Sequence, residues 1–284
     1  MNSSLRYQVR HRTAFYYAAP VSGSANTLHL HPSNFSHQRT ISCLIRVLPA
    51  TRLRAFNDLY ENITHHFEIP NPHQRLDIES VLKVENFPVE FSDRDEAAIL
   101  DDYKEPAIHE RTWSFLQASH YVSFPPEIWR QAVDVTCHHP RVLDKAKALM
   151  SWIHEEFTYD LESTKVSSKI EEVFEHRSGV CQDFTHVMLG MCRSIGIPAR
   201  YTSGYLYNGP RDTLIGAQAS HAWVEIFLPD SGWIGLDPTN NTLADTRFIK
   251  VAVGRDYDDV APVKGQYQGT ASCRMEVDLE VSLL

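Results

Sequence analysis

The stretch HRSGVCQDFTHVML places Cys181 between a Gly-Val turn and the start of an apolar pattern with helical spacing. The pattern ends at Gly196 and Pro198, so a helix is predicted to begin at or beside Cys181. Backbone N–H groups and the macrodipole at a helix N-terminus favour a thiolate. Gly179 would let the backbone come close to a developing oxyanion. The apolar positions are Phe184, Val187, Met188, Met191, Cys192 and Ile195.

A base and its orienting acceptor follow further along the chain. His221 lies in SHAWVE and Asp237 in GLDPTN, on two runs that read as adjacent strands. A turn between Pro229 and Gly232 could bring them side by side. Asp237 would then hold the tautomer of His221 whose free nitrogen faces the sulfur, which is the arrangement of nucleophilic catalysis by a thiol.

Each of these three residues also fits a structural role. A lone cysteine at the start of a helix is often a small buried side chain. A histidine followed by Ala222 and Trp223 on a strand is often a hydrogen-bonded core residue, and an aspartate before proline commonly starts a turn. Spacing alone therefore leaves both interpretations open.

The elements that must position these residues fall into two parts. Residues 41–47, 63–69 and 76–84 alternate apolar and polar side chains, which predicts antiparallel strands packed as a small sandwich or barrel. Residues 90–111 carry eight acids and three bases, a composition typical of a linker and a solvated first helix of a second domain. We therefore expect an N-terminal β domain over residues 1–89 and a second domain over 90–284.

The second domain mixes helices and strands. Residues 140–157 have helical apolar spacing with a proline suited to the first turn. RYTSGYLY, SHAWVEIFLP and SGWIGLDPT are rich in aromatic and β-branched residues and read as consecutive antiparallel strands. The C-terminal SCRMEVDLEVSLL alternates strictly and predicts a further strand. The predicted fold class is α+β.

Composition narrows the classes of partner. The 284 residues carry a formal net charge of -9, which disfavours phosphate backbones and anionic lipid, so neither nucleic acid nor a membrane is expected as a partner. No signal peptide or long apolar run is seen, and a cytoplasmic protein is expected. The five cysteines are scattered, and no CxxC pair or histidine motif predicts zinc. We expect no metal and no cofactor.

Three strings together resemble one known family. RSGVCQDFTHVMLGMCRSIGIPARYTSGY and SHAWVEIFLPDSGWIGLDPTN are similar, in that order, to the bacterial branch of the transglutaminase-like superfamily, thiol enzymes with a papain-like Cys-His-Asp arrangement. The resemblance to the catalytic core covers about residues 135–245. HRTAFYYAAPVSGSANTLHLHP and VAVGRDYDDVAPVKGQYQG resemble the same branch, whose members carry an N-terminal β domain. The resemblance implies a core of helices packed on an antiparallel sheet.

The resemblance also implies roles for individual residues. Cys181 would be the nucleophile, His221 the general base and acid, and Asp237 the orienting carboxylate. The backbone N–H of Cys181 would be one oxyanion donor. Asp183 fits the Cys-x-Asp pattern, where capping or a loop salt bridge in the first helical turn is its expected task, with a direct catalytic role as the alternative. Candidate substrate-binding residues are Gln182, Tyr205 and Trp223, with core packing an equal possibility for Tyr205.

The function expected from these features is cofactor-free acyl transfer from amide or peptide bonds through an acyl-enzyme. A protein or peptide substrate is the expected partner. Water as acceptor gives a cysteine protease or amidase, which we favour, whereas a lysine amine gives a crosslinking transglutaminase. A third alternative is a non-catalytic protein-binding module in which Cys181 is an ordinary buried thiol.

Overall fold

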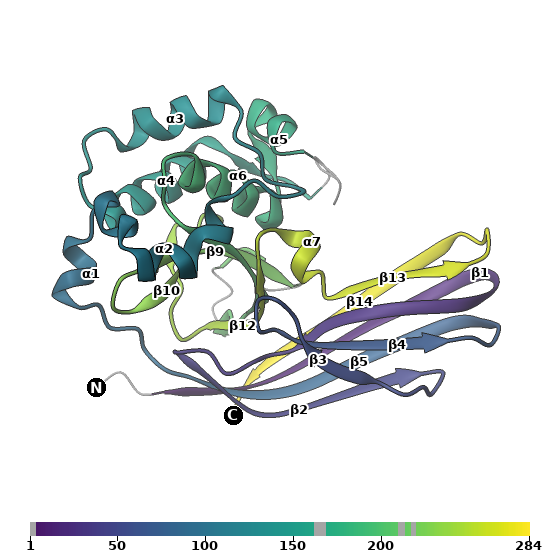
Figure 1. Ribbon diagram of the computed structural model, residues 1–284. Helices are drawn as coiled ribbons and strands as arrows, with labels where there is room; N and C mark the ends of the chain where they lie inside the picture. The colour runs from purple at the N-terminus through teal and green to yellow at the C-terminus, as the bar shows by residue number, and fades with distance from the viewer. Residues whose placement is uncertain (1–3, 162–168, 210–213, 217–219) are drawn as a thin grey trace.

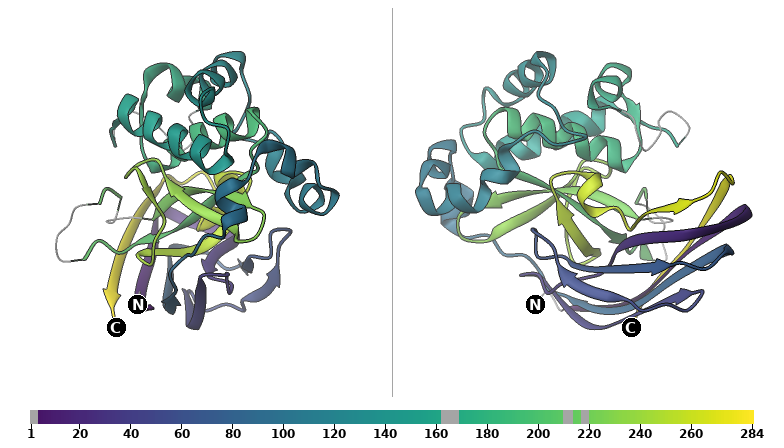
Figure 2. Two further views of the ribbon diagram at one scale, coloured as in Figure 1. Left: turned by 90° about the vertical axis from the view of Figure 1, so that its left-hand side faces the viewer. Right: turned by 45° about the vertical axis from the view of Figure 1, so that its right-hand side comes forward.

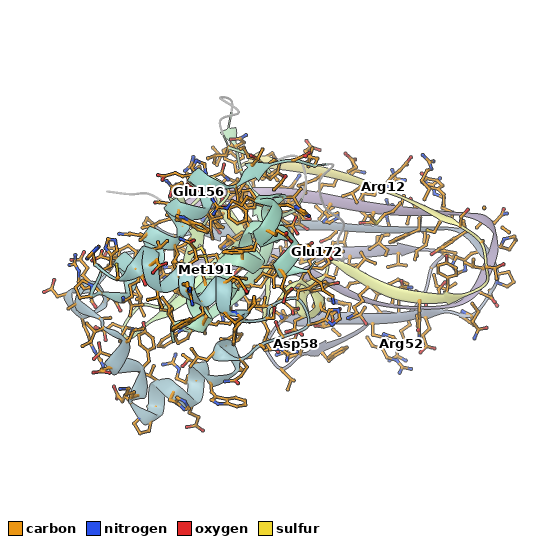
Figure 3. All side chains as sticks on the ribbon, turned by 90° about the horizontal axis from the view of Figure 1, so that it is seen from above. Arg12, Arg52, Asp58, Glu156, Glu172 and Met191 are labelled. Atoms are coloured by element: carbon orange, nitrogen blue, oxygen red, sulfur yellow. The ribbon has the colours of Figure 1, made fainter. Side chains whose placement is uncertain are left out.

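The structure, a computed structural model, describes residues 4–161, 169–209, 214–216 and 220–284. Helices gather at one end, a five-stranded sheet lies beneath them, and long strands extend away from both (Figure 1). Viewed from above, the helical layer surrounds Met191, and the long strands reach past it on the side of Arg12 (Figure 3). The α+β fold expected from the sequence is confirmed.

The first sheet has seven strands in the order β2-β5-β1-β4-β3, with β13 and β14 also paired to β1. Its strands are β1 (Leu5–His31), β2 (Gln38–Leu48), β3 (Arg54–Asn57), β4 (Ile63–Ile69), β5 (His73–Asn86), β13 (Val263–Gln268) and β14 (Cys273–Leu283). The strands predicted at 41–47, 63–69 and 76–84 lie within β2, β4 and β5. The 27-residue β1 was not among the predicted strands. It pairs with β4, β5, β13 and β14.

This sheet is antiparallel, as expected, and forms an open, curved half-barrel where a small sandwich or barrel was predicted (Figure 2). Part of its inner face packs on the other sheet of the molecule: the first sheet supplies Tyr7, Val9, Leu82 and Val84, and the second supplies Tyr205, Ile249 and Val251. Because residues of the second sheet cover this apolar surface, no further sheet of the N-terminal part is needed there.

The end of the chain returns to the first sheet. β14 pairs antiparallel with β1 from Tyr7↔Leu283 to Tyr17↔Cys273, and β13 pairs with a later part of the same strand. The expected boundary between residues 89 and 90 therefore marks only the first crossing of the chain between the two sheets. The chain crosses back before β13. Residues 263–283, which sequence grouped with the second domain, complete the first sheet because their alternating pattern matches the free edge of β1.

The second sheet has the order β11-β10-β9-β8-β12 and is antiparallel in the pairs β12/β8, β8/β9, β9/β10 and β10/β11. Its strands are β8 (Ala199–Leu206), β9 (His221–Leu228), β10 (Gly232–Asp237), β11 (Thr242–Leu243) and β12 (Phe248–Gly254). All residues of β9 are buried. A short parallel pair joins β6 (Thr158–Tyr159) to β7 (Ser178–Gly179).

The helices lie mostly over one face of the second sheet, with α6 packed against β9 and β8 (Figure 1). They are α1 (Asp93–Ala97), α2 (Pro106–Thr112), α3 (Pro126–Thr136), α4 (Val142–Glu156), α5 (Ile170–His176), α6 (Cys181–Ser194) and α7 (Tyr257–Val260), with 3-10 turns η1 (Leu100–Lys104) and η2 (Trp113–Leu116). The helix predicted at 140–157 is α4. The acidic segment 90–111 holds α1, η1 and most of α2, each short.

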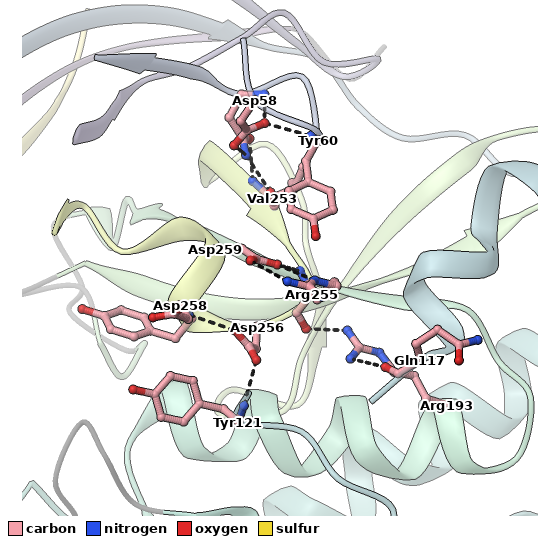
Figure 4. A network of polar contacts seen from close by, with 12 residues as sticks. Asp58, Tyr60, Gln117, Tyr121, Arg193, Val253, Arg255, Asp256, Asp258 and Asp259 are labelled. Carbon is pink, nitrogen blue, oxygen red and sulfur yellow. Dashed lines mark hydrogen bonds and ion pairs between the residues drawn. The ribbon is translucent and has the colours of Figure 1, made fainter. Parts of the chain in front are cut away.

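Buried polar contacts fix the two parts to each other and fix α6 within the second part (Figure 4). Asn62, held by Asp58, bonds both backbone groups of Val253 on β12 at 2.8 Å. Near the end of α6, Arg193 donates to the carbonyl oxygens of Gln117 and Arg255. Because this guanidinium is buried, its carbonyl partners supply the hydrogen bonds that water would otherwise make.

Across the described ranges, no helix is both long enough and apolar enough to cross a bilayer.

Candidate active site

Cys181 is the first residue of α6, as the sequence predicted. The Asp183 carboxylate accepts the Val180 N–H at 2.9 Å and so caps the first turn of the helix. A Cβ on Gly179 would lie 2.7 Å from both Cβ and Oδ2 of Asp183, so a larger residue would displace this cap. The glycine is therefore required by the packing that presents the thiol at the helix N-terminus.

His221 begins β9 and Asp237 ends β10, and the hairpin between these strands brings the two side chains together. Nε2 of His221 donates to Oδ2 of Asp237 at 2.8 Å. The backbone N–H of Thr239 donates to Oδ1 at 2.9 Å, which holds the carboxylate in one orientation. The pairing expected from the sequence is present, with Nε2 on the carboxylate side of the ring.

The opposite ring nitrogen, Nδ1, is buried and has no well-aligned hydrogen bond to any described residue. Cys181 is nevertheless close enough to act on the ring. Burial lowers the pKa of His221, but the charge and hydrogen bond of Asp237, with a further contribution from the Cys181 thiol, raise it to about 10. A carboxylate on one side and a sulfur on the other both stabilise the imidazolium.

The side chains of Cys181, His221 and Asp237 are buried from solvent. Cys181 is 9% exposed, and the side chains of His221 and Asp237 are 0% exposed. Tyr159 on β6 lies near the thiol and the carboxylate; burial first, and then the charges of Cys181 and Asp237, raise its pKa to about 12. Low exposure reduces screening by water, so the interactions among these groups are stronger than at the surface.

Residues 129–238 match the model of the transglutaminase-like superfamily, and residues 7–85 match that of the bacterial transglutaminase-like N-terminal region. Protein Rv2569c of Mycobacterium tuberculosis is 33% identical to this chain, over 99% of this chain and 94% of its own length. The chain belongs to the transglutaminase-like superfamily.

The chain is also similar to one further relative and to one solved structure. A protein-glutamine gamma-glutamyltransferase of Pseudomonas aeruginosa is 35% identical over 100 residues, which are 33% of this chain and 15% of that protein. A solved structure described as "a Putative Cysteine Protease from Cytophaga hutchinsonii" superposes with a TM-score of 0.81 at 20% identity, covering 100% of this chain and 92% of that one. That structure shows that the whole two-part fold is shared.

Within this superfamily fold, the three substrate-binding candidates lie in different surroundings. Gln182 is half-buried on the first turn of α6, beside the nucleophile candidate. Tyr205 is buried on β8, and its hydroxyl is 2.7 Å from Nδ1 of His11 in the first sheet, so its observed contact joins the two parts. Trp223 is buried, stacks near His221 at 6.1 Å between ring centroids, and lines a small pocket between the sheets.

One residue beside the pair of His221 and Asp237 was not singled out from the sequence. Asn240 donates from Nδ2 to Oδ2 of Asp237 at 2.7 Å. It stands three residues after the aspartate in DPTNN, in a turn where the sequence alone suggests only loop structure. The signal in the sequence is an amide side chain three residues after the aspartate that is expected to orient His221.

Within the described ranges, no three histidine, cysteine, aspartate or glutamate side chains are grouped so that they could hold a metal ion.

Proposed function

We propose that this member of the superfamily is a cysteine protease or amidase that acts through Cys181, His221 and Asp237. The observation that carries the proposal is the 2.8 Å contact from Nε2 of His221 to Asp237, which directs the opposite nitrogen toward a thiol at the start of α6. The raised pKa of His221 means that the ring can hold a proton beside a thiolate and release it to a leaving group.

Two steps complete the reaction. The Cys181 sulfur forms a bond to the carbonyl carbon, the carbonyl electrons move to oxygen, and the tetrahedral species expels the amine, which takes the proton from Nδ1 of His221. Water then gives a proton to Nδ1 while its oxygen attacks the thioester, and the sulfur leaves as a thiolate paired with the imidazolium. The backbone N–H of Cys181, at the N-terminus of α6, is positioned to stabilise the oxyanion in both steps.

A primary amine in place of water would give transamidation at the same three residues. The local similarity to a protein-glutamine gamma-glutamyltransferase favours keeping this as the second candidate. We favour hydrolysis because it needs no subsite beyond the thiol and the imidazole. Incubation with casein and a fluorescent primary amine separates the two: new peptide termini support hydrolysis, whereas ammonia release with incorporated amine supports transamidation.

Activation of the thiol is tested by alkylation with iodoacetamide between pH 5 and pH 9. Cys181 should react well below pH 8, faster than exposed Cys137 and Cys273 in the same chain, and His221→Ala should abolish the difference. Slow labelling of Cys181 at every pH in the wild-type chain, with no better rate than these exposed cysteines, would favour the non-catalytic binding module instead.

A further inference from the structure

A short surface segment lies directly against the candidate catalytic imidazole. We call residues Leu214, Ile215 and Gly216 the strap. A Cβ on Gly216 would lie 2.5 Å from Nδ1 of His221 and 3.0 Å from Cε1, and the φ of Gly216 is +91°. The backbone of the strap thus lies against the nitrogen that the proposed reaction uses, and only glycine fits there, because of both the close approach and the positive φ.

Asn240 ties this strap to the triad carboxylate. Its Oδ1 accepts the Ile215 N–H at 2.8 Å, and its Nδ2 donates to the Ile215 carbonyl oxygen at 3.1 Å. The same Nδ2 donates to Oδ2 of Asp237 at 2.7 Å. An amide nitrogen has two hydrogens, so both are used, and a flipped amide would put its oxygen against two acceptors.

A second asparagine holds the other end of the strap. Nδ2 of Asn208 donates to the Leu214 carbonyl oxygen at 3.0 Å, and its Oδ1 accepts the Leu214 N–H at 2.8 Å. Asn208 holds the strap through Leu214, whereas Asn240 contacts both the strap and the Asp237 carboxylate. The two residues therefore separate the effect of holding the strap from the effect of orienting the carboxylate.

We propose that Asn240 is a positioning residue: its one amide fixes the orientation of Asp237 and holds the strap beside Nδ1 of His221, which limits the access of bulk water to the pair of imidazole and thiol. This inference rests on the proposed function. Limiting bulk water strengthens the attraction between imidazolium and thiolate, because both charges are then less screened. Fixing the carboxylate keeps the ring in the tautomer and orientation that the thiol needs.

Several titratable groups lie near the imidazole and contribute to any pH profile measured there. Asp237 on β10 and Cys181 on α6 act on the ring directly. Tyr159 on β6 and Tyr201 on β8 lie close to the thiol, as does Asp183 in the first turn of α6. Asn240 is uncharged at every pH, so its removal changes orientation and water access without adding or removing a charge.

The test compares Asn240→Ala with the wild-type chain, using iodoacetamide for the thiol and p-nitrophenyl acetate for turnover. We expect the pH midpoint of Cys181 alkylation to rise by about one unit. We expect kcat to fall about 10- to 100-fold with KM nearly unchanged, as for other residues that orient a reacting group from behind. Asn240→Asp retains an acceptor for Ile215 but sets a second carboxylate beside Asp237, and should lower kcat more than Ala does.

Two further variants keep the test decisive. Ser151→Ala removes a 3.0 Å hydrogen bond to Asn241, the residue next to Asn240. Its alkylation midpoint and kcat should match those of the wild-type chain. Asn208→Ala releases the Leu214 end of the strap but leaves the bonds from Asn240 to Ile215 and Asp237, so it should raise the alkylation midpoint with a smaller fall in kcat. It also covers the case in which Asn240→Ala does not fold, as judged by thermal unfolding.

The two proposals fail in different ways. An activated wild-type thiol with an unchanged pH midpoint and kcat in folded Asn240→Ala overturns the positioning role alone. A wild-type Cys181 that labels no faster than an exposed cysteine, and no turnover of p-nitrophenyl acetate, overturns the proposed function and this inference with it.

Discussion

Paired cations and carboxylates occur in both sheets, but their surroundings differ. On the first sheet, three acids of β5 each bind two arginines: Asp77 with Arg12 and Arg75, Glu79 with Arg10 and Arg46, and Glu85 with Arg6 and Arg39. The arginine side chains in these pairs are between 35% and 62% exposed. In the second sheet, the His221 and Asp237 side chains are fully buried. The same chemistry is screened in one place and unscreened in the other.

A third cluster shows that burial alone does not make a pair reactive. Glu225, on the same strand as His221, binds Arg200 at 2.7 Å and also binds Lys250, and all three side chains are nearly buried. Guanidinium and ammonium groups hold their protons firmly, whereas an imidazole can exchange its proton in the course of a reaction. Burial therefore sets the strength of each pair, and the type of cation decides whether the pair stabilises the fold or handles protons.

The largest expected effect is on the buried pair beside the thiol. Asp237→Asn retains the shape of the side chain but reverses which group donates, so the wrong tautomer of His221 is favoured. We expect kcat to fall by about 10⁴-fold, by analogy with the serine-enzyme triad. Turnover of p-nitrophenyl acetate by the variant and by wild type, together with their thermal unfolding, gives the measurement. A folded variant with near wild-type turnover would contradict the triad.

The buried structural cluster should instead affect stability. Glu225→Gln leaves Arg200 and Lys250 buried without their shared carboxylate. We expect the free energy of unfolding to fall by about 3–5 kcal/mol. Urea denaturation at neutral pH measures this, and alkylation of Cys181 in the folded variant serves as the control. A fall in the free energy of unfolding below about 1 kcal/mol, the range of exposed pairs, would show that this cluster is as well screened as the arginine–carboxylate pairs of the first sheet.

The raised pKa of His221 predicts how stability depends on pH. A group whose pKa is higher in the folded chain, here about 10 against an ordinary value of 6.5, adds stability that is complete below pH 6.5 and is lost as the pH rises through 10. In a Cys181→Ala background, where Asp237 still raises the pKa of His221, the stability advantage of His221 over His221→Gln should therefore shrink as the pH rises from 6 toward 10. Urea denaturation across this range measures it, and a constant advantage would show that the imidazole gains no proton affinity on folding.

The smallest effect is expected on the outer face of the first sheet. Glu79→Gln removes the carboxylate shared by Arg10 and Arg46, whose side chains are 48% and 62% exposed. The free energy of unfolding should fall by at most about 1 kcal/mol, and the difference should diminish at high salt. Urea denaturation at low and high salt measures both quantities. A loss as large as that in Glu225→Gln would remove the contrast between the two sheets.

Local patterns in the sequence were sufficient for the elements that carry the site. Apolar spacing after Cys181 predicted α6, and strings rich in aromatic and β-branched residues predicted β8, β9 and β10. The pairing of His221 with Asp237 follows from a short hairpin, so it too could be predicted. These features depend on residues close together in the chain, where periodicity and turn chemistry limit the possible arrangements.

Contacts between distant segments needed the tertiary structure. β13 and β14 return to β1, and the second sheet covers part of the open half-barrel. Both features depend on which apolar surfaces meet, and alternation alone does not identify the partner of a strand. The same holds for Asn240, whose amide reads as part of a turn until folding sets the Ile215 backbone and the Asp237 carboxylate on either side of it. The sequence by itself determined which groups could react, because chemistry depends on residue type. The fold decided how far those groups are buried from water and which residues fix their orientation. Burial and long-range hydrogen bonds exist only once distant parts of the chain pack together.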